Sequence, residues 1–136
     1  MFYLIYRSVA TIVPSEADLG KLLEHARPAN AERGITGMLL YQNGRYMQML
    51  EGDEAAVRAL FAAIAADQRH RDVKVVASGP LGKRLFDDWS MGFRDMDRVA
   101  GLPDYDTYLA SQLADDRFGS EARVAYQFMF HFVESA

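Results

Sequence analysis

Tyr6 and Gln48 are the two residues whose chemistry and spacing first point to a reactive site. Gln48 lies in the stretch NGRYMQMLEG, where alternation places it with Tyr46 and Leu50 on one face of a strand. Tyr6 occupies the same sheet face on a neighbouring predicted strand. Burying a primary amide without partners costs roughly 1–3 kcal/mol, so an inward Gln48 requires hydrogen-bonding groups close by. A tyrosine hydroxyl supplies one, and a polar planar ligand held between two helices would supply the rest.

Other polar residues have ordinary structural interpretations when each is taken alone. Asn30 is typical of a helix terminator, and Gly34 is typical of a helix C-cap. Arg69 and His70 follow the second predicted helix, where cations interact favourably with the last carbonyl groups. None of these residues indicates a function by itself.

The composition excludes sulfur chemistry. The chain has 136 residues, half of them apolar, which is enough for one compact domain with a sizeable core. It contains no cysteine, so disulfides, thiolate nucleophiles, cysteine zinc sites and covalent cysteinyl adducts are excluded. His25, His70 and His131 are scattered without an HxH or HxxxH pair, so no metal site is predicted.

The distribution of charge argues against a broad nucleic-acid surface or an anionic membrane patch. There are 19 acidic and 15 basic residues, and no basic run is longer than a pair. Neither nucleic acid nor a membrane surface is therefore expected to bind. No apolar span reaches the roughly 18 residues of a membrane helix, and Arg7 comes too early for a signal peptide, so a cytoplasmic location is expected.

The pattern of strands and helices predicts an α+β fold. An Asn-Gly turn joins two strands into a hairpin, and Ser15 and Asp53 stand at the N-caps of two helices. Pro28 lies inside the first helix and is expected to kink or interrupt it. The order β-α-β-β-α-β-β predicts a ferredoxin-like sheet with an extra strand and both helices on one face. The expected elements are strands at 2–8, 36–41, 43–52, 72–81 and 90–96, and helices from 15 toward 30 and from 54 to about 67.

The C-terminal region is predicted to contain two short helices, at residues 104–116 and 120–136. Val124, Phe128 and Phe132 form an apolar stripe on the second helix. Such a stripe is expected to be buried against another surface.

Five ordered segments of the chain resemble the BLUF family of flavin-binding blue-light sensors, of the short stand-alone type. The resemblance covers residues 3–96, and the set of segments is far more specific than any one of them. Pro28 departs from the pattern, and no output domain is recognisable. The segments are YRS with Tyr6 and Ser8, NAERGITGMLLY with Asn30, GRYMQMLEG with Gln48, DQRHRDV with Arg69 and His70, and DWSMGF with Trp89 and Met91.

The resemblance implies that an isoalloxazine ring lies between the two helices over the sheet. Asn30 would hydrogen-bond its polar edge, and Gln48 would bridge that edge and the Tyr6 hydroxyl. Tyr6 would give an electron to the photoexcited flavin, and a proton would follow through the Gln48 amide. Recombination would leave Gln48 rotated, tautomerised or both. No covalent adduct is involved, which agrees with a chain that lacks cysteine.

The resemblance also implies the remaining members of the site. Ser8, Arg69 and His70 would complete the cofactor-binding set, and the planar fork of an arginine suits a phosphate tail. FAD is the expected cofactor, with FMN or riboflavin as alternatives. Trp89 and Met91 would relay the change at Gln48, although ordinary core packing is an equal alternative for Met91.

The implied function is that of a signalling protein and not of an enzyme. Residues 1–100 would form the photosensor, and residues 101–136 would pack on the opposite sheet face over residues such as Ile5 and Met49. Light-driven changes in residues 90–96 would alter this docking. The altered surface would then bind a downstream protein or a second copy of the chain.

Two other classes of function compete with the sensor. A small ferredoxin-like phosphatase of the acylphosphatase type could use Arg7 or Arg69 with Asn30 as an anion site, but this leaves Tyr6 facing Gln48 unexplained. A ligand-free oligomerising module would explain the apolar C-terminal helix but not the polar pocket. The loop GPLGKR lacks the glycine spacing and the hydroxyl of a phosphate loop.

Overall fold

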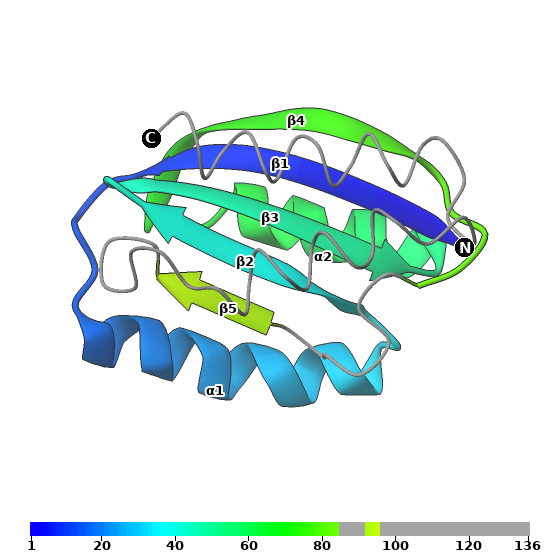
Figure 1. Cartoon of the computed structure of the whole chain (residues 1–136), viewed down its shortest axis with the longest axis horizontal. Coiled ribbons are helices and arrows are strands. Elements are labelled where there is room, and N and C mark those ends of the chain that lie inside the picture. Colours follow the sequence, from blue (N-terminus) through cyan, green and yellow to red (C-terminus); the bar gives the residue numbers. More distant parts are fainter. Residues whose placement is uncertain (85–91, 96–136) are drawn as a thin grey trace, which may run out of the picture.

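The computed structural model describes residues 1–84 and 92–95, and these form a five-stranded sheet with two helices (Figure 1). The strand order is β4-β1-β3-β2-β5. All neighbouring strands run antiparallel except β2 and β5, which are parallel. The predicted ferredoxin-like order is therefore confirmed. The elements are β1 (Phe2–Ala10), α1 (Glu16–Glu32), β2 (Thr36–Gln42), β3 (Arg45–Gly52), α2 (Glu54–Ala65), β4 (His70–Pro80) and β5 (Gly92–Asp95).

The β2–β3 hairpin forms as predicted. Asn43 and Gly44 have φ values of 51° and 74°, which is the left-handed pair of conformations that two-residue hairpin turns favour. The turn sets Tyr41 opposite Tyr46 and Leu39 opposite Gln48. Every side chain of β3 is thereby assigned to one face of the sheet, because a shift by one residue would reverse all of them.

The first helix begins as predicted but does not break at Pro28. The Ser15 hydroxyl accepts from the Asp18 backbone N–H at 3.1 Å, and the Asp18 carboxylate accepts from the Ser15 N–H at 3.0 Å. The predicted interruption is wrong, since α1 continues to Glu32. Pro28 is exposed, so the backbone donor that it lacks is lost on the solvent side, while Leu19 and other buried residues hold the helix on the sheet.

The second helix and the strand after it differ from prediction at their ends. Asp53 occupies the N-cap position with extended backbone, but its side chain makes no capping hydrogen bond. The helix ends at Ala65, short of the expected end near Asp67. The next strand begins at His70, two residues before the predicted start, because Asp72 adopts φ 54° and is absorbed as an irregularity in the pairing with β1.

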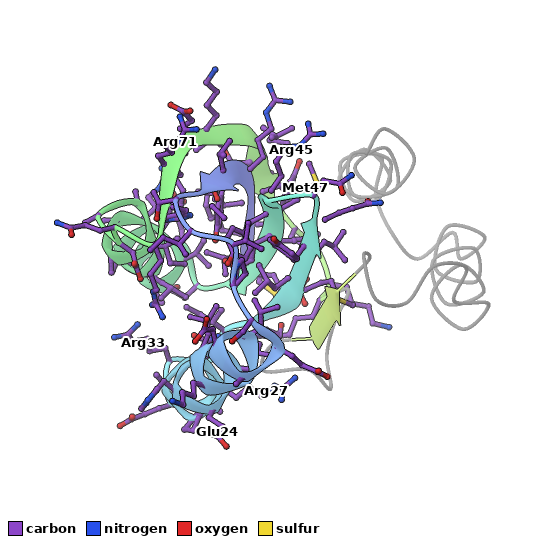
Figure 2. All side chains as sticks on the ribbon, turned by 90° about the vertical axis from the view of Figure 1, so that its left-hand side faces the viewer. Glu24, Arg27, Arg33, Arg45, Met47 and Arg71 are labelled. Atoms are coloured by element: carbon purple, nitrogen blue, oxygen red, sulfur yellow. The ribbon has the colours of Figure 1, made fainter. Side chains whose placement is uncertain are left out.

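Both helices pack on one face of the sheet. The cluster that joins them includes Leu19 and Leu23 of α1, Val57 of α2 and the sheet residues Leu4 and Leu39. The opposite face carries another row of buried residues, and Figure 2 shows Met47 on this side, away from α2. Fully buried members of that row are Ile5, Met38, Leu40, Met49 and Glu51.

Several predictions fall outside the described residues. Trp89, Met91 and both helices of residues 101–136 belong to this group. Of the fifth predicted strand, the described part is β5. No helix in the described part of the chain is long and apolar enough to cross a membrane.

Candidate functional site

A cavity of about 270 Å³ lies between α1, α2 and the sheet. Its lining divides into a buried floor and an exposed rim. Apolar side chains of both helices form the walls. Polar floor residues are Tyr6, Asn30, Tyr46 and Gln48, and charged or ionisable rim residues are His25, Arg33, Asp67 and Arg69.

The floor is built around a contact between Tyr6 and Gln48. The sheet register sets these residues directly opposite each other on β1 and β3, and both are buried. The Tyr6 hydroxyl donates a hydrogen bond to Oε1 of Gln48. Burial raises the pKa of Tyr6 far above its ordinary value, and the nearby Tyr46 and Asp67 add to the effect. The phenol therefore keeps its proton, and that proton lies on the bond to the amide.

Asn30 contributes a second buried amide to the cavity. It lies in the last turn of α1 and is 3% exposed. The interpretation of Asn30 as a helix terminator is wrong, since Arg33 is the C-cap residue. Gly34 follows with φ 69°, as the C-cap interpretation of that glycine predicts. Asn30 is thus positioned by a helix that continues past it, with its side chain facing the cavity.

His70 is engaged by the protein through both ring nitrogens. Nε2 lies 2.5 Å from the carbonyl oxygen of Ile64 at the end of α2, and Nδ1 lies 2.7 Å from the Ser8 hydroxyl. A carbonyl only accepts, so Nε2 carries a proton, and in the neutral ring Nδ1 accepts from Ser8. The ring lies nearly perpendicular to those of Tyr6 and Tyr46, at angles of 78° and 82° with centroids 6.2 and 6.3 Å away.

Ser8 and His70 both take part in this network, and their role in cofactor binding stays a prediction. Ser8 is 2% exposed and is not among the described residues that line the cavity. His70 lines the cavity, but its nitrogens already have protein partners. Through these two contacts, Ser8 and His70 connect β1, β4 and the end of α2.

Tyr46 is a floor residue that the sequence analysis assigned only to the face of Gln48. Its ring centroid lies 5.1 Å from that of Tyr41, directly opposite on β2. Burial, with the neighbouring Tyr41 hydroxyl, raises the pKa of Tyr46 to about 12. Alternation predicts the correct sheet face for Tyr46. It does not predict that Tyr46 lines a cavity, because an aromatic residue in a strand usually packs in the core.

The rim carries an ion pair that sequence reasoning did not anticipate. Nε of Arg69 lies 3.0 Å from each carboxylate oxygen of Asp67, and Nη2 lies 2.5 Å from Oδ2. The Arg69 backbone N–H also donates to Asp67, at 2.9 Å. These hydrogen bonds hold the pKa of Asp67 below its ordinary value and raise the pKa of Arg69. In the sequence, the one indication of this pair is that Asp67 and Arg69 are two residues apart. That spacing brings side chains together only in a turn.

The anion site of the competing phosphatase interpretation does not assemble around Arg7. Arg7 is exposed and pairs with Met47, whereas Asn30 faces the cavity on the other side of the sheet. Arg69 does share the cavity with Asn30, but it is held by Asp67.

The fold and the cavity together are those of an α+β domain with a small-molecule site between its two helices. A family model described as sensors of blue light using FAD, the BLUF family, matches residues 1–92. The chain therefore belongs to the BLUF family.

Individual relatives agree with this assignment. Photoactivated adenylate cyclase subunit beta of Euglena gracilis is 38% identical over 82% of this chain, which spans only 13% of that relative. The dark-state structure of BlrB, a BLUF protein, is 29% identical with a TM-score of 0.72, covering 99% of this chain and 96% of BlrB. Klebsiella pneumoniae BlrP1, solved with FMN and cyclic diGMP, is 29% identical with a TM-score of 0.80 over 98% of this chain and 34% of BlrP1.

Proposed function

We propose that this chain is a blue-light receptor that holds a flavin non-covalently in the cavity and signals through the hydrogen bonds of Gln48. The observation that carries the proposal is the buried contact between Tyr6 and Gln48 on the cavity floor. A bound flavin supplies blue-light absorption and an excited state that accepts an electron. The residues of the cavity suit such a group, because the buried amides of Asn30 and Gln48 would hydrogen-bond a polar ring edge and the apolar walls would pack on the ring.

Tyr6 is the electron donor in this proposal. Its buried phenol is protonated and hydrogen-bonded to an amide oxygen. Loss of an electron makes a phenol strongly acidic, so its proton would follow the electron through the Gln48 amide toward the flavin. When both the electron and a proton return to Tyr6, Gln48 would be left rotated, tautomerised or both.

An amide suits this role because it has a donor at one end and an acceptor at the other. Exchanging the two ends rewires the contacts of Gln48 while its shape and charge stay nearly constant. Two hydrogen-bond arrangements that differ by a few kcal/mol form a two-state element whose minor state light can populate. A glutamate would be mostly ionised and would only accept.

We further propose that the signal leaves through β2 and β5. Leu39 of β2 pairs with Gln48 on one side and with Phe93 of β5 on the other, and it also lines the cavity. Trp89 and Met91 immediately precede β5 in the sequence and are the proposed relay. Residues 101–136 are the proposed output segment, acting on a downstream protein or a second copy without enzymatic activity of their own.

The test is the absorption spectrum of the purified chain. We expect a yellow protein whose flavin band shifts slightly to the red under blue light and recovers in the dark. Gln48→Leu should keep the colour and lose the shift, whereas Gln42→Leu, outside the cavity on the same hairpin, should keep both. Colourless protein that no flavin reconstitutes would rule out the receptor, and a normal shift in Gln48→Leu would rule out the mechanism.

A further inference from the structure

We infer that Arg33, and not Arg69, is the residue that recognises the phosphate of a bound flavin nucleotide. This inference rests on the proposed function. Arg33 would contact the phosphate, whereas the negative charge of Asp67 would weaken phosphate binding. Arg33 and Asp67 both line the cavity, on opposite walls.

The size of the cavity places a phosphate at the rim. A volume of about 270 Å³ lies just below the usual range for small-molecule sites, so it accommodates a fused ring system better than a whole nucleotide. The floor offers neutral polar groups, and the charged side chains gather where the lining becomes exposed. A tail that leaves the floor therefore passes between α1 and the turn that follows α2.

Arg69 is not available as a fork for phosphate. Its Nε and Nη2 atoms both bond to the Asp67 carboxylate, and the pair has no net charge. A phosphate approaching this side of the rim meets Asp67 as well as Arg69. For Arg69 to bind phosphate, its hydrogen bonds to Asp67 would have to break. These are the hydrogen bonds that raise the pKa of Arg69 and lower that of Asp67.

Arg33 offers a guanidinium from the other wall. Figure 2 shows it extending from α1 on the side on which α2 lies. Asn30 and Ala29 lie three and four residues before Arg33, so its own helix supplies no acidic partner at these positions. Among the described residues, no carboxylate forms an ion pair with Arg33.

The spacing along α1 supports the same assignment. His25, Ala29 and Arg33 follow one another at four-residue steps and all line the cavity, with Asn30 beside them. A ligand whose polar ring edge meets Asn30 therefore lies on the same helix face as Arg33. An arginine binds phosphate through two parallel N–H donors, and an exposed pair of this kind is worth a factor of about three to five in affinity.

The experiment compares riboflavin with FMN, which differ by the phosphate alone. The flavin-free full-length chain is titrated with each, and binding is followed by flavin fluorescence in low and high salt. We expect wild type to prefer FMN. Arg33→Gln should lose about three- to fivefold in FMN affinity with riboflavin affinity unchanged. Arg33→Lys should recover part of the preference, and Asp67→Asn should increase it by releasing Arg69.

The matched control is Arg27→Gln, an exposed arginine of the same helix that does not line the cavity. It should leave both affinities unchanged. Equal weakening of riboflavin and FMN by Arg33→Gln would overturn the inference, since it would show a structural role. Loss of the FMN preference in Arg69→Gln but not in Arg33→Gln would overturn it as well. Binding of neither flavin by wild type would instead defeat the proposed function from which the inference starts.

Discussion

The two faces of β3 carry buried polar groups of opposite character. On the cavity face, Gln48 and Tyr6 are neutral and joined by one hydrogen bond. On the other face, Glu51 is 0% exposed and accepts from the Thr36 hydroxyl at 2.7 Å. Nη1 of Arg84 donates to that hydroxyl at 2.8 Å, so a cation, a hydroxyl and a carboxylate follow one another.

The second cluster ties distant segments together. Arg84, after β4, also donates to the carbonyl oxygen of Gly34 at 2.6 Å and to that of Glu51 at 3.4 Å. Arg84 is half-buried and Glu51 is fully buried, so removing one hydrogen-bond partner from this cluster costs about 1–3 kcal/mol. A neutral amide beside a cavity can exchange its ends at much lower cost. One strand therefore carries a hydrogen-bonded clamp of Thr36, Glu51 and Arg84 on one face and, in the proposed function, a switchable pair on the other.

The largest difference between the two faces of the sheet is expected when one tyrosine hydroxyl is removed from each. Tyr6→Phe should abolish the reversible spectral shift while flavin binding persists, because the electron and proton donor is lost. Tyr3→Phe, which alters a buried tyrosine on the opposite face, should leave the shift intact. Flavin absorption before and after blue light measures both. An undiminished shift in Tyr6→Phe would remove the functional distinction between the faces.

A second test perturbs the clamp. Thr36→Val keeps the shape of the side chain but leaves Glu51 and Arg84 without the hydroxyl between them. We expect the free energy of unfolding in urea to fall by about 1–3 kcal/mol, with the light response retained.

The matched control for the clamp is Thr11→Val. The Thr11 hydroxyl donates to the Gln68 carbonyl at an exposed site, so its loss should cost less than about 0.5 kcal/mol. Equal effects in the two variants would show that the clamp is no stronger than a surface hydrogen bond.

The smallest expected effect concerns the alkaline stability of the cavity floor. The pKa of Tyr46 is about 12 in the folded chain, against about 10 for an unfolded tyrosine. As pH rises past about 10, the unfolded state loses its proton first, so the stability from this group is present below that pH and declines up to about 12. Tyr46→Phe should make the decline of unfolding free energy between about pH 9 and 11 shallower. Part of the decline should remain in this variant, because burial also raises the pKa of Tyr6. An unchanged slope of unfolding free energy against pH in Tyr46→Phe would show that Tyr46 is not desolvated.

Local patterns in the sequence predicted the elements and the placement of Tyr6 beside Gln48. Alternation placed Tyr6 and Gln48 on one face, the Asn-Gly turn set the hairpin, and Ser15 began a helix, because these features depend on neighbouring residues. The predicted interruption at Pro28 is wrong, because packing of the opposite helix face outweighs one missing backbone donor.

The tertiary structure alone decided how the polar side chains are paired. His70 meets Ser8 across 62 residues, and Arg84 meets Thr36 across 48, and such contacts follow from strand register and not from composition. The pairing of Asp67 with Arg69 depends on where α2 ends. What the sequence determined by itself was that Tyr6, Tyr46 and Gln48 share one face of the sheet. Which of them remain available to a ligand was decided by the fold, because each hydrogen bond made within the protein removes a donor or acceptor from the site.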